Sequence, residues 1–245
     1  MGTRDRRAEI VTELEQELRA LPRGHRVPGE QQLVGRFEVS RATIRAALQE
    51  LEAQHLIRRV AGVGTFVQHR IAYPITPRHA PTFSEVVRAA GAKPRTVLLE
   101  HAVVGAPQKL AGTLPVQPGQ PVQQLRRLGH IDQEPACLHE EWFSPRVEVD
   151  LGLAVRSFGS VGEVLRSAGF RPRRILTRGT MAAAPEAICA QLGIPLRAQA
   201  WMVASTSVDD DSQEALVHSR SWLRADLVRM VFDVVPLTEA DPGTD

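Results

Sequence analysis

The chain has 245 residues, 43% hydrophobic and 24% charged, which suits a globular protein of one large or two small domains. Its formal net charge is +2, and Cys137 and Cys189 are its only cysteines, which disfavours a disulfide framework or a zinc ribbon. We find no signal-peptide core and no run of about 18 apolar residues, so we expect a cytoplasmic protein that does not bind a membrane.

Residues 1–70 carry twelve arginines and nine acidic residues, an excess of only three positive charges. This excess is too small to indicate nucleic-acid binding by itself. The order of the residues is more informative.

Three helices are predicted in this part of the chain. Ile10, Leu14 and Leu18 recur every four residues and predict an amphipathic helix that Pro22 ends. EQQLVGRF, which begins at Glu30, suits a second short helix. Ser40 is a good N-cap for a third helix, RATIRAALQELEAQ.

The segment LIRRVAGVGTFV predicts a wing of two short strands around a glycine turn, with Arg58 and Arg59 available to phosphates. A helix placed in the major groove reaches base edges from its first turn, where Arg41 and Arg45 lie. We therefore predict a winged helix-turn-helix over residues 1–68 that binds double-stranded DNA. The alternative, a helical domain with merely solvated arginines, explains the agreement of cap, arginines and wing less well.

The run from Pro28 to Val67 resembles the DNA-binding domain of the GntR family. One departure is Gly29, where the family usually has Ser or Ala, a change that we expect to leave the helix start intact. Together with the position of Arg59 in the wing, the resemblance implies DNA contacts at Glu30, Gln31, Ser40, Arg41, Thr43, Arg45, Arg59 and Gly62.

QHRIAYPITPRHAP contains three prolines and predicts an extended linker over residues 69–81. A second domain is expected over residues 82–237, followed by a tail over residues 238–245. The second domain contains an internal repeat, which predicts an antiparallel sheet of two related halves with helices, an α+β fold. Residues in matching places lie 78 or 79 positions apart: Pro107 and Pro185, His139 and His218, Phe143 and Trp222.

This half contains no nucleophile elbow, P-loop or HExxH motif, so we predict neither an enzyme nor a cofactor. His130, Cys137, His139 and His218 are possible metal ligands. Because His139 and His218 occupy matching repeat positions, a shared structural role is favoured over a metal site.

A small anion site is the remaining hypothesis. Arg126 and Arg127 alternate along a strand, so only one of them faces a given pocket. Ser160 is the expected N-cap of the helix SVGEVLRSAG, where backbone N–H groups and the helix dipole attract anions. Glu140, Arg178 and Ser219 are strand residues that can join this site.

The second half is similar to the UTRA effector domain of the HutC subfamily, a chorismate-lyase-like fold. More narrowly, IAYPI, FSEVVRAAGAKP and RADLVR resemble regulators of phosphonate metabolism. The resemblance implies a homodimer with a pocket for a small organic anion. It places contacts at Arg127 and Ser160, and less directly at Ser84, Glu140, Arg178 and Ser219.

The leading hypothesis is a ligand-responsive repressor of genes for phosphonate, phosphate or related small-anion metabolism. An alternative is a regulator of the same type that senses a sugar phosphate or another small organic acid. Two other classes are an enzyme acting on a phosphorylated small molecule and a DNA-binding protein without a ligand. The enzyme requires a nucleophile and a base brought together in the second domain.

Overall fold

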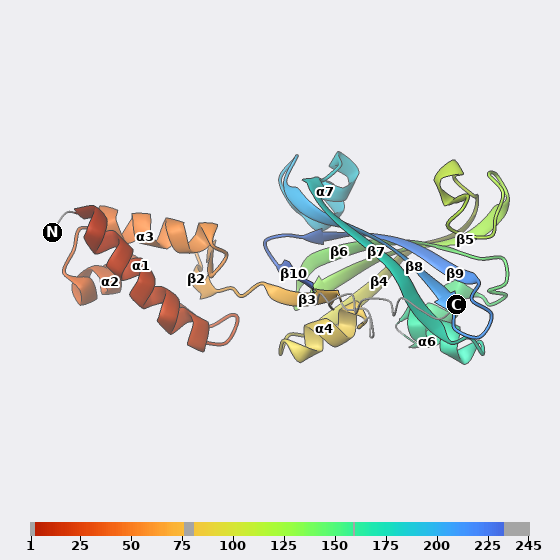
Figure 1. Ribbon diagram of the computed structural model, residues 1–245. Coiled ribbons are helices and arrows are strands. Elements are labelled where there is room, and N and C mark those ends of the chain that lie inside the picture. The colour runs from red at the N-terminus through yellow and green to blue at the C-terminus, as the bar shows by residue number, and fades with distance from the viewer. Residues whose placement is uncertain (1–2, 76–80, 159, 233–245) are drawn as a thin grey trace, which may run out of the picture. The chain divides into compact units, whose positions relative to one another are not determined.

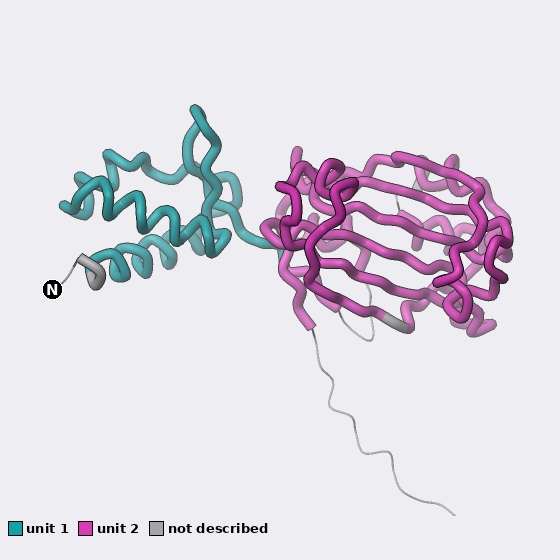
Figure 2. Tube along the Cα trace, turned by 90° about the horizontal axis from the view of Figure 1, so that it is seen from above, with its two compact units in different colours: residues 1–71 teal, residues 72–245 magenta. Residues whose placement is uncertain are grey.

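The computed structural model describes residues 3–75, 81–158 and 160–232, so the expected tail over residues 238–245 lies outside them. The chain divides into two compact units, residues 1–71 and residues 72–245 (Figures 1 and 2). Among the helices of the described ranges, none is long and apolar enough to cross a membrane.

Unit 1 is a bundle of three helices followed by a wing, as the sequence predicts. Ile10, Leu33, Ile44 and Leu51 are fully buried in its core. Ser40 caps the third helix, because its hydroxyl accepts the backbone N–H of Thr43 at 3.2 Å. The elements are α1 (Thr3–Ala20), α2 (Glu30–Phe37), α3 (Arg41–Ala53), β1 (Ile57–Val60) and β2 (Gly64–Val67).

The wing contains an additional extended segment that the sequence did not reveal. The N–H of Val27 donates to the carbonyl of Thr65 at 2.9 Å, and the N–H of Val67 donates to the carbonyl of His25 at 2.8 Å. The segment that precedes α2 therefore pairs with β2, and Arg26 forms an antiparallel backbone β-bridge with Phe66. This pairing fixes Arg26 beside the wing.

Unit 2 is built on a six-stranded antiparallel sheet in the order β4-β5-β6-β9-β8-β7, with a separate pair of β3 and β10. Residues 71–75, expected to belong to an extended linker, form β3 instead, which corrects that expectation. The elements are β3 (Ile71–Ile75), α4 (Phe83–Ala89), β4 (Pro94–Gly105), a 3-10 turn η1 (Gln108–Leu110), β5 (Pro121–Ile131), β6 (Glu134–Phe143), α5 (Leu151–Phe158), α6 (Val161–Ser167), β7 (Pro172–Ala183), α7 (Glu186–Leu192), β8 (Gln199–Asp209), β9 (Ala215–Arg224) and β10 (Val228–Phe232).

The repeat appears as two half-sheets that meet between β6 and β9. In the first half Gln124 pairs with Trp142, and in the second half Met202 pairs with Trp222. Matching residues of the two halves are therefore 78 positions apart on β5 and β8 but 80 positions apart on β6 and β9. The difference arises because the connection between β8 and β9 is longer than that between β5 and β6. The sequence-based prediction that Phe143 matches Trp222, and His139 matches His218, in the repeat was therefore wrong.

The correct counterparts are Trp142 for Trp222, and Ser219 for His139. His139 and His218 also point to opposite faces of the sheet, because Ser219, which is adjacent to His218 in β9, lines a cavity together with His139. A shared structural role for the two histidines is therefore excluded.

Helices cover both faces of the sheet (Figure 1). On one face α5 and α6 bury Leu151, Val164 and Leu165 against sheet residues such as Leu125 and Phe143. On the other face α7 packs on Trp222, and the segment after β4 that contains η1 packs on Trp142. Helices α4 and α5 were not predicted from the sequence.

Candidate functional site

The exposed side of α3 in unit 1 carries the two arginines expected to read DNA. The side chains of Arg41 and Arg45 are 71% and 54% exposed. Both point back to Glu30 at the start of α2, whose carboxylate accepts Arg41 Nε at 3.1 Å and Arg45 Nη2 at 3.3 Å. These hydrogen bonds lower the pKa of Glu30, with Arg45 as the largest cause. Glu30 therefore stays charged and holds both guanidinium groups on one side of the helix.

These residues line a groove of about 950 Å³ whose other side is formed by the wing and by Arg26. Arg26 Nη2 donates to the carbonyl of Val63 at 3.2 Å, so the arginine is fixed to the wing. With Arg41 and Arg45 it gives the groove three positive charges against the one negative charge of Glu30. Sequence reasoning missed Arg26, because the segment that contains it pairs with β2, a contact between residues distant in the sequence.

The remaining predicted DNA contacts have different local roles. Ser40 is exposed, but the hydroxyl of Thr43 lies 2.8 Å from that of Ser40 and Thr43 is only 8% exposed, so it completes the helix cap. Arg59 Nη2 donates to the carbonyl of Arg45 at 3.3 Å, which ties the wing to α3.

Two further predicted contacts lie at the groove and at the wing. Gln31 lines the groove at the start of α2. Gly62 has a φ of +73° in the wing turn, a conformation that glycine adopts without strain.

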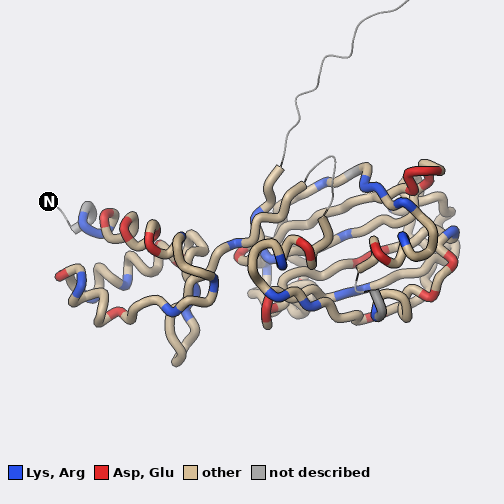
Figure 3. Tube along the Cα trace, turned by 90° about the horizontal axis from the view of Figure 1, so that it is seen from below, with Lys and Arg blue, Asp and Glu red and all other residues tan. Residues whose placement is uncertain are grey.

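Acidic residues of unit 1 are concentrated on α1 (Figure 3). Glu13 and Glu17 of this helix pair with Arg36 of α2. Since these acids are committed to helix packing, the positive groove between α3 and the wing keeps its charge despite the small net charge of the domain.

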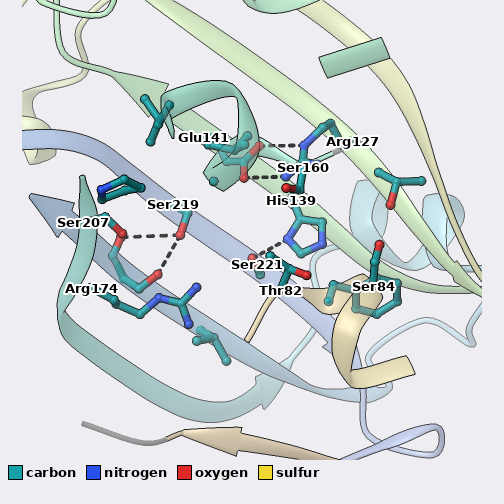
Figure 4. Close-up of a pocket in the computed structure, with 18 of the residues that line it drawn as sticks. Thr82, Ser84, Arg127, His139, Glu141, Ser160, Arg174, Ser207, Ser219 and Ser221 are labelled. Carbon is teal, nitrogen blue, oxygen red and sulfur yellow. Dashed lines mark hydrogen bonds and ion pairs between the residues drawn. The ribbon is translucent and has the colours of Figure 1, made fainter. Parts of the chain in front are cut away.

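Unit 2 contains an inner cavity of about 180 Å³ between the sheet and the helices α4 and α6 (Figure 4). Four of the six predicted ligand residues line it: Ser84, Arg127, Ser160 and Ser219. Ser160 caps α6, because its hydroxyl accepts the N–H of Glu163 at 3.2 Å.

Glu140 and Arg178 do not line this cavity. Glu140 pairs with Arg220 on the opposite face of the sheet, where Arg220 Nε donates to it at 3.0 Å. Arg178 is exposed and pairs in register with Ala204, which alternates with the cavity residues Val203 and Ser205.

Arg127 and Glu141 form a buried ion pair at the cavity. Arg127 Nε and Nη2 donate to the two carboxylate oxygens at 2.8 and 2.6 Å, and the two residues are 7% and 6% exposed. The neighbouring Arg127 keeps the pKa of Glu141 below its usual value against the opposing effect of burial. Glu141 therefore offsets the charge of Arg127, so a net positive charge in the cavity has to come from other residues.

Two further arginines line the cavity, Arg166 of α6, which is exposed, and the less exposed Arg174 of β7, which the sequence did not reveal. The guanidinium of Arg174 points into the cavity (Figure 4), and no carboxylate of the described chain lies within salt-bridge distance of it. Its Nε is buried without a hydrogen-bond partner within the described ranges. With Arg127 offset by Glu141, Arg166 and Arg174 leave the lining of the cavity with a net charge of +2.

Tyr73 connects this cation to β3. The phenol is buried in the cavity wall, and burial raises its pKa, while Arg174 acts in the opposite direction through its charge and a hydrogen bond. The cavity is therefore lined in part by the strand that follows unit 1 in the sequence.

Small hydroxyl side chains form much of the cavity floor. Ser205 and Ser207 of β8 and Ser219 and Ser221 of β9 all line it. The hydroxyls of Ser205 and Ser219 lie 2.8 Å apart. Such short polar side chains leave space above the sheet and offer hydrogen bonds to the oxygens of an anion. Of these four serines only Ser219 was predicted.

His139 lies 2.8 Å from the hydroxyl of Ser221, which is the contact that a serine nucleophile and its base make. Burial, together with the charge of Arg127, lowers the pKa of His139 to about 4. A histidine with so low a pKa is a weak base near pH 7, so this contact is better suited to binding than to nucleophilic catalysis.

Comparison with known proteins follows the same division. Residues 6–67 match "Bacterial regulatory proteins, gntR family" and residues 89–229 match the UTRA domain. The "Probable transcriptional regulator PhnF" of Escherichia coli is 31% identical over 230 residues, covering 92% of this chain and 93% of that protein. The transcriptional regulator GgaR of the same organism is 28% identical, covering 84% and 81%. The crystal structure of PhnF from Mycobacterium smegmatis has a TM-score of 0.64 at 26% identity, covering 92% and 99%.

Proposed function

Because the chain belongs to the GntR family of bacterial transcriptional regulators and carries a UTRA domain, we propose that it is a repressor that responds to a small anion bound beside Arg174. The observation that carries this proposal is the guanidinium of Arg174, which has no carboxylate partner among the described residues and faces a cavity of serine hydroxyls. Anions bind where charge-assisted hydrogen bonds replace their lost hydration.

The chain is a regulator and not an enzyme, since its curated relatives are named transcriptional regulators. The low pKa of His139 agrees with this assignment. The contact between His139 and Ser221 then serves to order the cavity floor.

DNA recognition is assigned to the groove of unit 1. Arg41 and Arg45 would contact bases, while Arg26 and the wing would contact phosphates. One recognition helix reads few base pairs, so a homodimer that binds two half-sites about one helical turn apart is part of the proposal.

The effector class is proposed from the resemblance to regulators of phosphonate metabolism. Phosphonate, phosphate and sugar phosphate all carry the oxygens that Arg174 and the serines can bind. A ligand shifts the equilibrium between two protein conformations only if it binds one of them more tightly. An effector that binds the conformation free of DNA more tightly than the DNA-bound conformation would therefore release the protein from its operator.

The DNA part is tested with operator fragments selected from a random DNA library. Arg41→Ala and Arg45→Ala are expected to abolish specific binding in gel-shift assays and to leave the circular dichroism spectrum unchanged. Arg19→Ala is the matched control, because Arg19 lies on α1 and pairs with Glu15. Wild-type affinity in both α3 variants would overturn the assignment of the recognition helix.

The effector part is tested by thermal shift and operator release with methylphosphonate, inorganic phosphate and glucose 6-phosphate. A shift with methylphosphonate or phosphate supports the proposed class, whereas a shift with glucose 6-phosphate alone supports the sugar-phosphate alternative. The absence of any shift would overturn the proposed anion sensor.

A further inference from the structure

A second, outer cavity of about 420 Å³ adjoins the inner cavity in unit 2. The two share part of their lining, namely Thr82, Ser84, Thr96, Ser160 and Arg166. A single ligand can therefore contact both cavities. The outer cavity is bounded by α4, α5, α6 and β4.

Three arginines from three different helices face this outer cavity. They are Arg88 of α4, Arg156 of α5 and Arg166 of α6. All three are exposed, and in the described part of the chain no carboxylate lies within salt-bridge distance of any of them. Some other surface arginines of unit 2 have such partners; Arg171, for example, pairs with Asp211 at 2.8 Å.

The two acidic residues of the outer cavity take part in helix caps. Glu85 accepts the backbone N–H of Thr82 at 2.7 Å, and Glu163 accepts the hydroxyl of Ser160 at 3.0 Å. Arg166 lines both cavities, whereas Arg88 and Arg156 line only the outer one. Together the two cavities are lined by five arginines and three glutamates, a net charge of +2.

We propose that the effector is an elongated molecule with an anionic group at each end, one bound by Arg174 and the other by Arg88 and Arg156. This inference rests on the proposed function, since it assumes that the inner cavity binds the effector. A ligand with a single charged group would leave one of the two positive regions without a counter-charge. Phosphonates with a carboxylate at the far end of a short chain have the required chemistry.

The test compares ligands of equal length that differ only in the second charge. Isothermal titration of the full chain with 4-phosphonobutyrate and with butylphosphonate separates the effect of the carboxylate from that of the chain. We expect 4-phosphonobutyrate to bind at least tenfold more tightly than butylphosphonate. Phosphonoacetate, in which one carbon instead of three separates the carboxylate from phosphorus, is expected to show a smaller gain.

Variants then locate the second charge. The double variant Arg88→Gln and Arg156→Gln, at two arginines that line only the outer cavity, is expected to remove the tenfold gain and to change the affinity for butylphosphonate less than threefold. A matched double variant of exposed arginines that line neither cavity, Arg178→Gln and Arg229→Gln, removes the same charge and is expected to keep the gain.

The outcomes distinguish this inference from the proposed function. If butylphosphonate binds and 4-phosphonobutyrate binds no more tightly, the two-ended effector is overturned while the anion sensor stands. The inference is also overturned if the double variant Arg88→Gln and Arg156→Gln binds 4-phosphonobutyrate and butylphosphonate more weakly by the same factor. If neither phosphonate binds, the proposed phosphonate sensing fails together with this inference.

Discussion

Arg174 and Arg178 lie four residues apart on β7, yet they point to opposite faces of the sheet. A β-bulge between Arg174 and Leu176 shifts the register by one residue. Arg174 therefore pairs with the cavity residue Ser207, whereas Arg178 pairs with Ala204 on the other face. In an unbroken strand the two arginines would share a face.

This relationship gives a first prediction. Arg174→Gln is expected to weaken the binding of methylphosphonate at least tenfold, since a hydrogen bond to a charged group contributes about 1.5–3 kcal/mol. Arg178→Gln, the control, is expected to leave the affinity unchanged. Titration calorimetry measures both, and equal affinities in the two variants would contradict the assignment of Arg174.

The buried pair of Arg127 and Glu141 gives a second prediction. Glu141→Gln leaves the guanidinium of Arg127 buried without a counter-charge, which is expected to cost about 3–5 kcal/mol of the free energy of unfolding. The double variant Arg127→Met with Glu141→Leu is expected to recover most of this loss. Urea unfolding followed by tryptophan fluorescence reports on unit 2 alone, because Trp142, Trp201 and Trp222 all lie there. A single variant as stable as the wild type would refute the structural role of the pair.

A third prediction concerns Glu30 in the DNA groove. Glu30→Gln removes the carboxylate that holds Arg41 and Arg45, so these side chains lose more conformational freedom when they bind DNA. It also removes a negative charge near the phosphates. The ratio of specific to non-specific affinity is therefore expected to fall about tenfold, with non-specific affinity unchanged or higher.

Fluorescence anisotropy with the selected operator and with a scrambled duplex measures this ratio. Glu38→Gln is the control, because it removes the same charge from an exposed position at the end of α2. If Glu38→Gln lowers the ratio as much as Glu30→Gln does, the positioning role of Glu30 is wrong.

The lowered pKa of His139 gives a fourth prediction. Because this pKa is about 4 in the folded protein against 6.5 as the ordinary value, the unfolded chain binds the proton more readily between these two pH values. The stability of unit 2 is therefore expected to decrease as the pH falls from about 6.5 to about 4, with no further loss from His139 below that.

His139→Gln removes this contribution and can keep a hydrogen bond to Ser221. The variant should show a smaller loss of stability between pH 7 and pH 5 in urea unfolding. Some loss remains, since burial also lowers the pKa of His130 and His218. An unchanged pH dependence would show that His139 titrates normally.

The sequence by itself determined the winged helix-turn-helix and the α+β class of the second half. The caps, the four-residue periodicity and the glycine turn of unit 1 act between residues close together in the chain, so they are readable without the fold. Ser40 and Ser160 were identified as N-caps for the same reason, because a cap depends on only three or four consecutive residues.

The tertiary structure alone decided which side chains share a cavity. Strand pairing brings Arg127 and Ser219 to one face and sends Glu140 to the other. The bulge in β7 places Arg174, and not Arg178, on the face of the sheet that lines the cavity. Registers and bulges depend on contacts between strands that are distant in sequence, and a shift of one residue exchanges the two faces of a strand. The sequence could therefore identify a domain with an anion site, but not the arginine that faces it.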